Sequence, residues 1–253
     1  PAKGIINVSD NGMDFVYEES ASGDIFIFLH QTYNNYGMLF NALLTDAQLD
    51  WLEGLLKKYK DDGKNIFIIE HANVAGWGSG DKLTAPYYYD LGLVKTNSDV
   101  ARFIKLMETY KECVIITGHT HLELSAQYNY SDNNGTSAVM MHNSAIGGVR
   151  YLNSSGNVQR EPAILGLSEG YIVEVYEDGI LFNGTNMYYN ETMPQCCYIV
   201  PMGTSENQGG ADTTPTEPAS DNVTITIKDT TGDGWMKNNA STREIQLIDN
   251  ATN

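Results

Sequence analysis

Two histidines one residue apart, His119 and His121, follow a short apolar run at residues 114–117. Residues i and i+2 of an extended chain point the same way, and a turn at the end of a strand would lift both rings out of the core. A third histidine, His71, ends another strand-like run at residues 66–70. Three imidazoles delivered by two strand ends can build a metal site in an α/β scaffold. We therefore expect His71, His119 and His121 to be metal ligands.

The elements that must position these rings alternate between strands and helices. The apolar run at residues 24–29 predicts a strand buried on both faces. Thr45 and Gln48 have the spacing of a capping box, so a helix is expected from there to about Tyr59. Further expected elements are a strand at residues 65–70, a long loop at 72–97, a helix after Ser98 and a strand at 113–117. This order is typical of an α/β fold with a largely parallel sheet.

Two hairpins are expected downstream of the histidine pair. The Asn-Asn-Gly turn at residues 133–135 predicts pairing of residues 122–130 with 137–142. The Asp-Gly pair at residues 178–179 predicts a second hairpin, because this dipeptide favours tight two-residue turns.

The same segments resemble a known family. Residues 20–188 are similar in order to the C-terminal half of calcineurin-like metallophosphoesterases, and the Gly-His-x-His step at residues 118–121 is the most specific match. The matching segments are residues 25–29, 48–53, 66–71, 114–121, 122–127, 140–145 and 171–182. The resemblance implies an α/β fold with a mixed β-sheet flanked by helices, half of an αββα sandwich, followed by a C-terminal β-hairpin segment.

The resemblance also implies an activity. A phosphoesterase of this family hydrolyses phosphate mono- or diesters with two divalent ions such as zinc, manganese or iron. His71 and His119 would bind one ion and His121 the other. The family's earlier Asp-x-His, Gly-Asp-x-x-Asp and Asn-His motifs have no counterpart in this sequence, and Asn73 stands where the family usually has proline. Hydrolysis therefore requires that these missing N-terminal ligands be supplied.

Charge and hydropathy limit the partners of the chain. A net charge of −17 over 253 residues argues against binding nucleic acid, because phosphate backbones need a basic surface. No apolar run reaches the length of a membrane span. The start at Pro1 fits a mature chain whose leader has been removed, and it fits a cytosolic chain equally well.

The asparagines favour secretion. Nine Asn-x-Ser/Thr sequons occur where chance predicts about three, and we expect N-linked glycans and an extracellular location. The nine are Asn7, Asn129, Asn134, Asn153, Asn183, Asn190, Asn222, Asn239 and Asn250. An asparagine-rich surface without glycans is the alternative.

Composition divides the chain into three parts. Residues 1–200 are expected to form the phosphoesterase-like domain, 201–222 a flexible linker and 223–253 a β-hairpin fragment of an accessory β domain. The loop between the last two strands resembles an Asp-x-x-Gly-Asp-Gly-Trp signature, in which Asp229 and Asp233 are candidate calcium ligands. A solvated hairpin loop is the alternative interpretation of these two aspartates.

A second class of function is a catalytically inactive structural subunit. Half of a two-layer sandwich would leave one apolar face of its sheet bare, so a second copy or another chain is expected to cover it. The C-terminal strand would be added to the sheet of a neighbour, and repeated head-to-tail contacts of this kind produce filaments. His30 and His142, which also lie near strand ends, are interpreted as structural residues.

Overall fold

The computed structural model describes residues 4–36, 39–60, 62, 64–80, 93–94, 98–153, 155, 158–159, 168–176, 179–201, 224–227 and 245–248. The contacts divide the chain into two compact units, Pro1–Ala211 and Asp212–Asn253. The boundary falls inside the linker expected at residues 201–222. None of the helices in the described ranges is both long enough and apolar enough to cross a membrane.

A mixed seven-stranded sheet is the centre of the first unit, with strand order β1-β2-β3-β6-β9-β11-β10. The pairs β3–β6, β6–β9 and β9–β11 are parallel, whereas the other neighbours are antiparallel. The strands are β1 (Ile5–Val8), β2 (Phe15–Glu18), β3 (Ile25–Phe28), β6 (Ile66–Ala72), β9 (Cys113–Gly118), β10 (Tyr130–Ser131) and β11 (Val139–His142). The carboxyl ends of the four parallel strands therefore meet at one edge.

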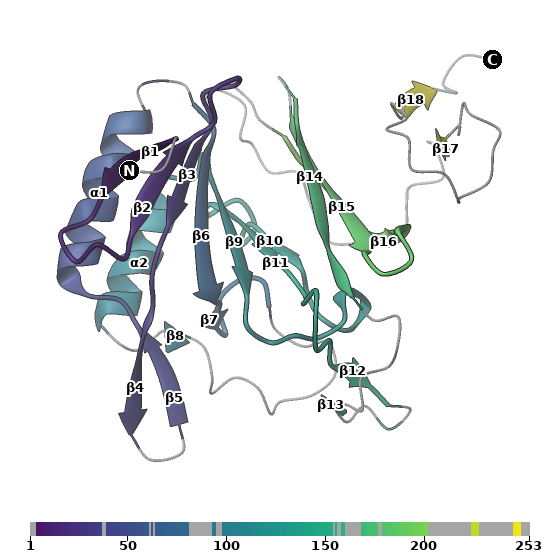
Figure 1. Ribbon diagram of the computed structural model, residues 1–253, viewed down its shortest axis with the longest axis horizontal. Coiled ribbons are helices and arrows are strands. Elements are labelled where there is room, and N and C mark those ends of the chain that lie inside the picture. Colours follow the sequence, from purple (N-terminus) through teal and green to yellow (C-terminus); the bar gives the residue numbers. More distant parts are fainter. Residues whose placement is uncertain are drawn as a thin grey trace. The chain divides into compact units, whose positions relative to one another are not determined.

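Two helices cover one face of this sheet, α1 (Asp46–Lys60) and α2 (Ser98–Thr109) (Figure 1). Their buried leucines, together with Phe103 and Met107, pack against the strand residues that face them, including Ile27, Ile68 and Ile115. Burial of a large apolar side chain contributes about 1.5–3 kcal/mol, so this layer is the main core of the unit.

A three-stranded antiparallel sheet covers the opposite face (Figure 1). It consists of β14 (Glu169–Val175), β15 (Gly179–Asn186) and β16 (Glu191–Pro201). A second core joins the two sheets, formed from the main sheet by Phe67, Val114 and Met141 and from the smaller sheet by Ile180, Phe182 and Val200. The expectation of a bare apolar sheet face is thus wrong, because the chain covers this face with its own strands.

The fold class expected from the sequence is confirmed as a mixed sheet with parallel strands and two helices, with a separate three-stranded sheet following it in the chain. Strand β16 was not expected. It contains Pro194, which lacks the backbone N–H that a central strand needs. The strand lies at the edge of its sheet, where this loss is tolerated.

Smaller pieces complete the first unit. The four-stranded sheet β4-β5-β8-β7 includes an antiparallel hairpin, β4–β5, between β3 and α1. Between β9 and β10 lies a short 3-10 helix, η2, rather than the long strand expected there. These elements are β4 (Thr32–Tyr36), β5 (Leu39–Leu43), β7 (Val74–Ala75), β8 (Leu93–Val94), η2 (Leu124–Ala126), β12 (Tyr151–Leu152) and β13 (Val158–Gln159).

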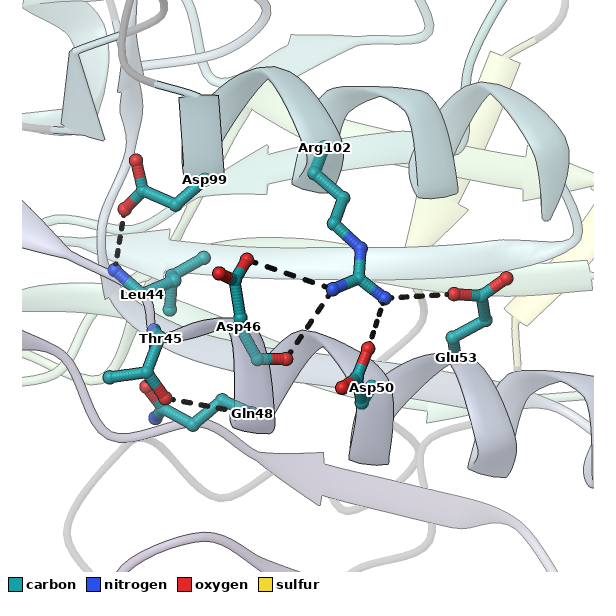
Figure 2. Close-up of polar contacts among 8 residues, drawn as sticks. All are labelled: Leu44, Thr45, Asp46, Gln48, Asp50, Glu53, Asp99 and Arg102. Carbon is teal, nitrogen blue, oxygen red and sulfur yellow. Dashed lines mark hydrogen bonds and ion pairs between the residues drawn. The ribbon is translucent and has the colours of Figure 1, made fainter.

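The start of α1 is fixed by the predicted capping box. The Gln48 N–H donates to Thr45 Oγ1 at 3.2 Å, and the Thr45 N–H donates to Gln48 Oε1 at 2.9 Å. Figure 2 shows how α2 is joined to α1 beside this cap, where Arg102 contacts Asp46, Asp50 and Glu53. Exposed ion pairs of this kind contribute about 0–1 kcal/mol, so the apolar contacts beneath them hold the two helices.

The second unit contains one antiparallel pair in its described residues, β17 (Thr224–Ile227) and β18 (Ile245–Ile248). Both strands were expected from their alternating sequences. The candidate calcium ligands Asp229 and Asp233 lie outside the described residues, as does the linker apart from Pro201.

Candidate metal and phosphoester site

The structure brings two of the three expected ligands together. His71 is the penultimate residue of β6, and His119 directly follows β9. These parallel strands pair up to their ends, where Ala72 is the partner of Gly118 after a shift of register between Ile69 and Ala72. Nε2 of His71 and Nδ1 of His119 lie 3.0 Å apart, and the two rings are nearly perpendicular, at 86°. The pairing that was inferred from two strand ends is therefore present in the fold.

The separation of these nitrogens suits a shared cation. Two nitrogen ligands of one tetrahedral zinc, each about 2.0–2.1 Å from the metal, lie roughly 3.3 Å apart. Burial lowers the pKa of His71, and the charge of His121 lowers it further. A lowered pKa favours the neutral imidazole, which is the form that binds metal.

His121 has a different immediate partner. Its Nδ1 lies 3.3 Å from the carbonyl oxygen of Gly148, so Nδ1 donates this hydrogen bond and Nε2 is left as the ligand atom of the neutral ring. No group of three or more histidine, cysteine or carboxylate side chains that could hold one metal occurs in the part of the chain that the structure describes. The described residues thus bring two candidate ligands to hydrogen-bond distance of each other and lack the remainder of a two-metal site.

The turn that carries the two histidines has an unusual backbone. His119 has φ 81° and His121 has φ 58°, in the left-handed region that costs an L-residue about 1–2 kcal/mol. Such conformations persist only where surrounding contacts enforce them, and they are concentrated at functional sites. Histidine, like asparagine and aspartate, adopts positive φ more often than most other non-glycine residues, but residue type alone did not predict this conformation.

A buried hydrogen-bond network enforces the turn. Thr120, between the two histidines, donates its hydroxyl proton to Gln127 Oε1 at 2.9 Å and accepts the N–H of Leu122 at 3.3 Å. Nε2 of His142 lies 2.9 Å from the same Thr120 oxygen. Because the Thr120 proton is committed to Gln127, we assign the proton of His142 to Nε2, from which it is donated to Thr120.

His142 is therefore a structural residue, as the sequence suggested. It is 0% exposed, and its Nδ1 lies 2.7 Å from the hydroxyl of Thr117, which donates to it. Burial lowers the pKa of His142 to about 3, with smaller effects from the charges of His119 and His71. The ring is neutral at physiological pH and links β11 to the histidine turn.

The loop after His71 closes over this network. Asn73 is 7% exposed, and the chain returns at Gly80, whose N–H donates to the carbonyl of Tyr128 at 2.7 Å. A Cβ on Gly80 would lie 2.7 Å from Nδ1 of His142 and 2.8 Å from Cγ of Asn73, and φ at Gly80 is 93°. Both the space and the backbone require glycine here. Trp77, in the same loop, packs against the helix-covered core.

A buried acid lies beside His71 on the strand. Glu70 is 4% exposed and accepts a hydrogen bond from Gln31 Nε2 at 3.2 Å. Burial raises the pKa of Glu70 to about 8, and the bond from Gln31 opposes this only in part. Glu70 is thus largely protonated at neutral pH and adds little negative charge to the site. The sequence pattern did not single out Gln31 or Glu70, because their proximity depends on the pairing of strands.

A shallow cavity of about 370 Å³, more open to solvent than enclosed, lies at the carboxyl edge of the parallel strands, next to the histidine pair. His71 and Gly118 line it, together with Asn143 and Ser144, which follow β11. This volume lies within the range of small-molecule pockets, and the position is where open α/β sheets place their ligands.

The expected glycosylation sites differ in how exposed their asparagines are. Asn129 is 2% exposed, and its Nδ2 donates to the carbonyl of Leu124 at 2.6 Å. The burial of Asn129 argues against a glycan there in the folded chain. Asn134 and Asn190 lie exposed in turns. Asn222, Asn239 and Asn250 lie outside the described residues.

No family model matches this chain, and no curated protein matches it.

Proposed function

We propose that this chain contributes to a metal-dependent hydrolase of phosphate mono- or diesters, with His71 and His119 as ligands of one divalent cation. The observation that carries the proposal is the 3.0 Å separation of their ring nitrogens at the rim of the cavity. The strained turn supports it, because backbone strain that is enforced by a buried network is typical of functional sites.

The residues of the chain would act mainly by holding and positioning. A bound divalent cation would polarise a phosphoryl oxygen and lower the pKa of its coordinated water. The β6 and β9 ends fix the His71 and His119 rings, while Thr120 and His142 fix the turn between His119 and His121. His121 is the proposed ligand of a second cation.

The proposal requires further ligands. Because the described residues supply two clustered histidines and no third, the bridging carboxylate and the remaining donors would come from residues beyond these or from another polypeptide. Zinc, manganese and iron are the candidate metals. The negative net charge of −17 would repel free anionic substrates unless bound cations reverse the field locally.

Metal binding is the direct test. Zinc and manganese affinities would be measured by isothermal titration calorimetry for the intact chain and for the variants His71→Ala and His119→Ala. We expect each variant to lose at least tenfold in affinity, since half of the clustered ligands are removed. His30→Ala is the matched control, because His30 also follows a parallel strand, and it should bind metal like the wild type.

Turnover separates binding from catalysis. Release of nitrophenol from p-nitrophenyl phosphate and bis-p-nitrophenyl phosphate would be followed with added zinc or manganese. Turnover that His71→Ala abolishes supports the hydrolase. Equal metal affinity in the wild type and both histidine variants would contradict the site, whereas tight metal binding without turnover would contradict hydrolysis by this chain alone.

A structural role is the second candidate, favoured by the outer face of the three-stranded sheet. Ile172 and Ile199 on this face are 42% and 64% exposed. We propose as the alternative a secreted, glycosylated subunit of an assembly whose partner, a second copy or another chain, packs here or receives the C-terminal strand. Sedimentation velocity of the intact chain tests it, because a monomer at all accessible concentrations would exclude self-assembly.

A further inference from the structure

We propose that the cavity beside His71 binds the uncharged, apolar alcohol portion of a phosphate ester, so that the site selects esters with an aliphatic or aromatic leaving group. The identity of the ester rests on the proposed phosphoesterase function, whereas binding of the alcohol portion rests on the cavity alone.

The walls of the cavity are apolar. Phe28, Leu29, Ile69 and Ile116 line it, contributed by three adjacent parallel strands and the residue after β3. Phe28, Ile69 and Ile116 are partly exposed, so they present apolar surface that a ligand would remove from water. Burial of apolar surface is the main source of affinity for such ligands.

Two polar groups at the end of β11 complete the cavity. Ser144 is 7% exposed, and its hydroxyl oxygen has no hydrogen-bond partner among the described residues. The same is true of Oδ1 of Asn143. Both oxygens are buried from solvent, so a ligand would reach them only after the two side chains rotate. Buried polar atoms are nearly always hydrogen-bonded, and a ligand hydroxyl or ester oxygen would then supply the missing partner.

The lining contains few ionisable side chains. Glu70 is the one carboxylic acid among the residues that line the cavity. The described lining includes no lysine or arginine that would hold a second phosphate.

The two products, phosphate and alcohol, would occupy different parts of the site. Water adds to phosphorus, the P–O bond to the organic group breaks, and the alcohol leaves with one proton from that water. The phosphate would remain at the histidine pair, and the alcohol would remain in the cavity. The cavity thus determines which leaving groups are accepted.

A series of straight-chain alcohols tests the cavity without metal or phosphate. Dissociation constants of 1-propanol, 1-butanol, 1-pentanol and 1-hexanol would be measured by ligand-observed NMR on the intact chain. We expect affinity to rise about fourfold per added methylene. Ser144→Ala should weaken the binding of every alcohol about fivefold, since one hydrogen bond is lost. The control Ser125→Ala replaces an exposed serine of η2 and should change nothing.

Affinity independent of chain length would overturn the inference, and so would equal binding by Ser144→Ala and the wild type. Hydrolysis of ethyl and hexyl phosphates with added metal distinguishes this outcome from failure of the proposed function. Chain-length-dependent alcohol binding without metal binding or turnover would leave the cavity in place and reject the hydrolase. Turnover with no preference for hexyl phosphate would support the hydrolase and reject the cavity as its leaving-group site.

Discussion

The hydroxyl oxygen of Thr120 lies 2.9 Å from Nε2 of His142, and this contact ties the turn that carries His119 and His121 to the end of a neighbouring parallel strand. The turn is therefore held by a residue from another strand as well as by contacts within its own segment. This arrangement, and the burial of the groups around it, lead to testable expectations for stability and for glycosylation.

Removal of the Thr120 hydroxyl should destabilise the fold. In Thr120→Val, the N–H groups of His142 and Leu122 lose their acceptor while the shape of the side chain is kept. We expect a loss of about 1–3 kcal/mol in the free energy of unfolding, measured in urea. Thr120→Ser keeps the hydroxyl and should lose less than half as much. Equal losses for the two variants would show that the methyl group, and not the hydroxyl, is what matters.

The positive φ at His119 predicts that glycine is more stable than alanine at this position once the ring is removed. Both His119→Gly and His119→Ala remove the ring, but only glycine adopts a φ of 81° without steric strain. After allowing for the greater freedom of glycine in the unfolded chain, we expect His119→Gly to be more stable than His119→Ala by about 0.5–1 kcal/mol. Thermal unfolding of the two variants measures this difference. An alanine variant at least as stable as the glycine variant would mean that the turn is not strained.

Glu70 should make stability depend on pH. Burial raises its pKa from the usual 4.5 to about 8. The contribution of its protonation to the free energy of unfolding is therefore fully present below pH 4.5 and is lost as the pH rises through 8. Relative to Glu70→Gln, which cannot ionise, the wild type should lose up to about 1.4 kcal/mol of its free energy of unfolding for each unit that the pH rises across this window. Urea unfolding of both proteins at pH 5, 6, 7 and 8 gives the difference.

His142 makes stability depend on pH in the opposite direction, but its effect is the same in the wild type and in Glu70→Gln. Its folded pKa of about 3 lies below the usual 6.5, so the stability that it provides is present above pH 6.5 and is lost as the pH falls. Both proteins contain His142, and the difference between them isolates Glu70. A difference that does not change with pH would contradict the buried, protonated state of Glu70.

Glycan mapping should separate buried from exposed sequons. When the chain is secreted from eukaryotic cells, we expect glycopeptide mass spectrometry to find glycans on the exposed turns at Asn134 and Asn190. We expect none on Asn129, which is 2% exposed. Asn134→Gln and Asn190→Gln should each remove one glycan mass. Asn129→Gln should leave the glycan mass unchanged. A glycan on Asn129 of the folded protein would contradict its burial.

The amino-acid sequence by itself determined most of the local structure. Continuous apolar runs predicted β3, β6 and β9, because strands that are buried on both faces have no polar side. The pair Thr45 and Gln48 predicted the start of α1 through hydrogen bonds between near neighbours, and two histidines at strand ends predicted that His71 and His119 would meet. Each of these inferences depends on contacts within one element or on the rule that parallel strands end at a common edge.

Tertiary structure decided what depends on distant residues. That β14, β15 and β16 cover the second face of the main sheet follows from packing of Phe182 and Val200 against Phe67 and Met141, which no local pattern encodes. The strained φ at His119, the burial of Asn129 and the raised pKa of Glu70 arise in the same way. Each of these is a property of the environment that the folded chain creates around a residue, and the type of the residue does not reveal it.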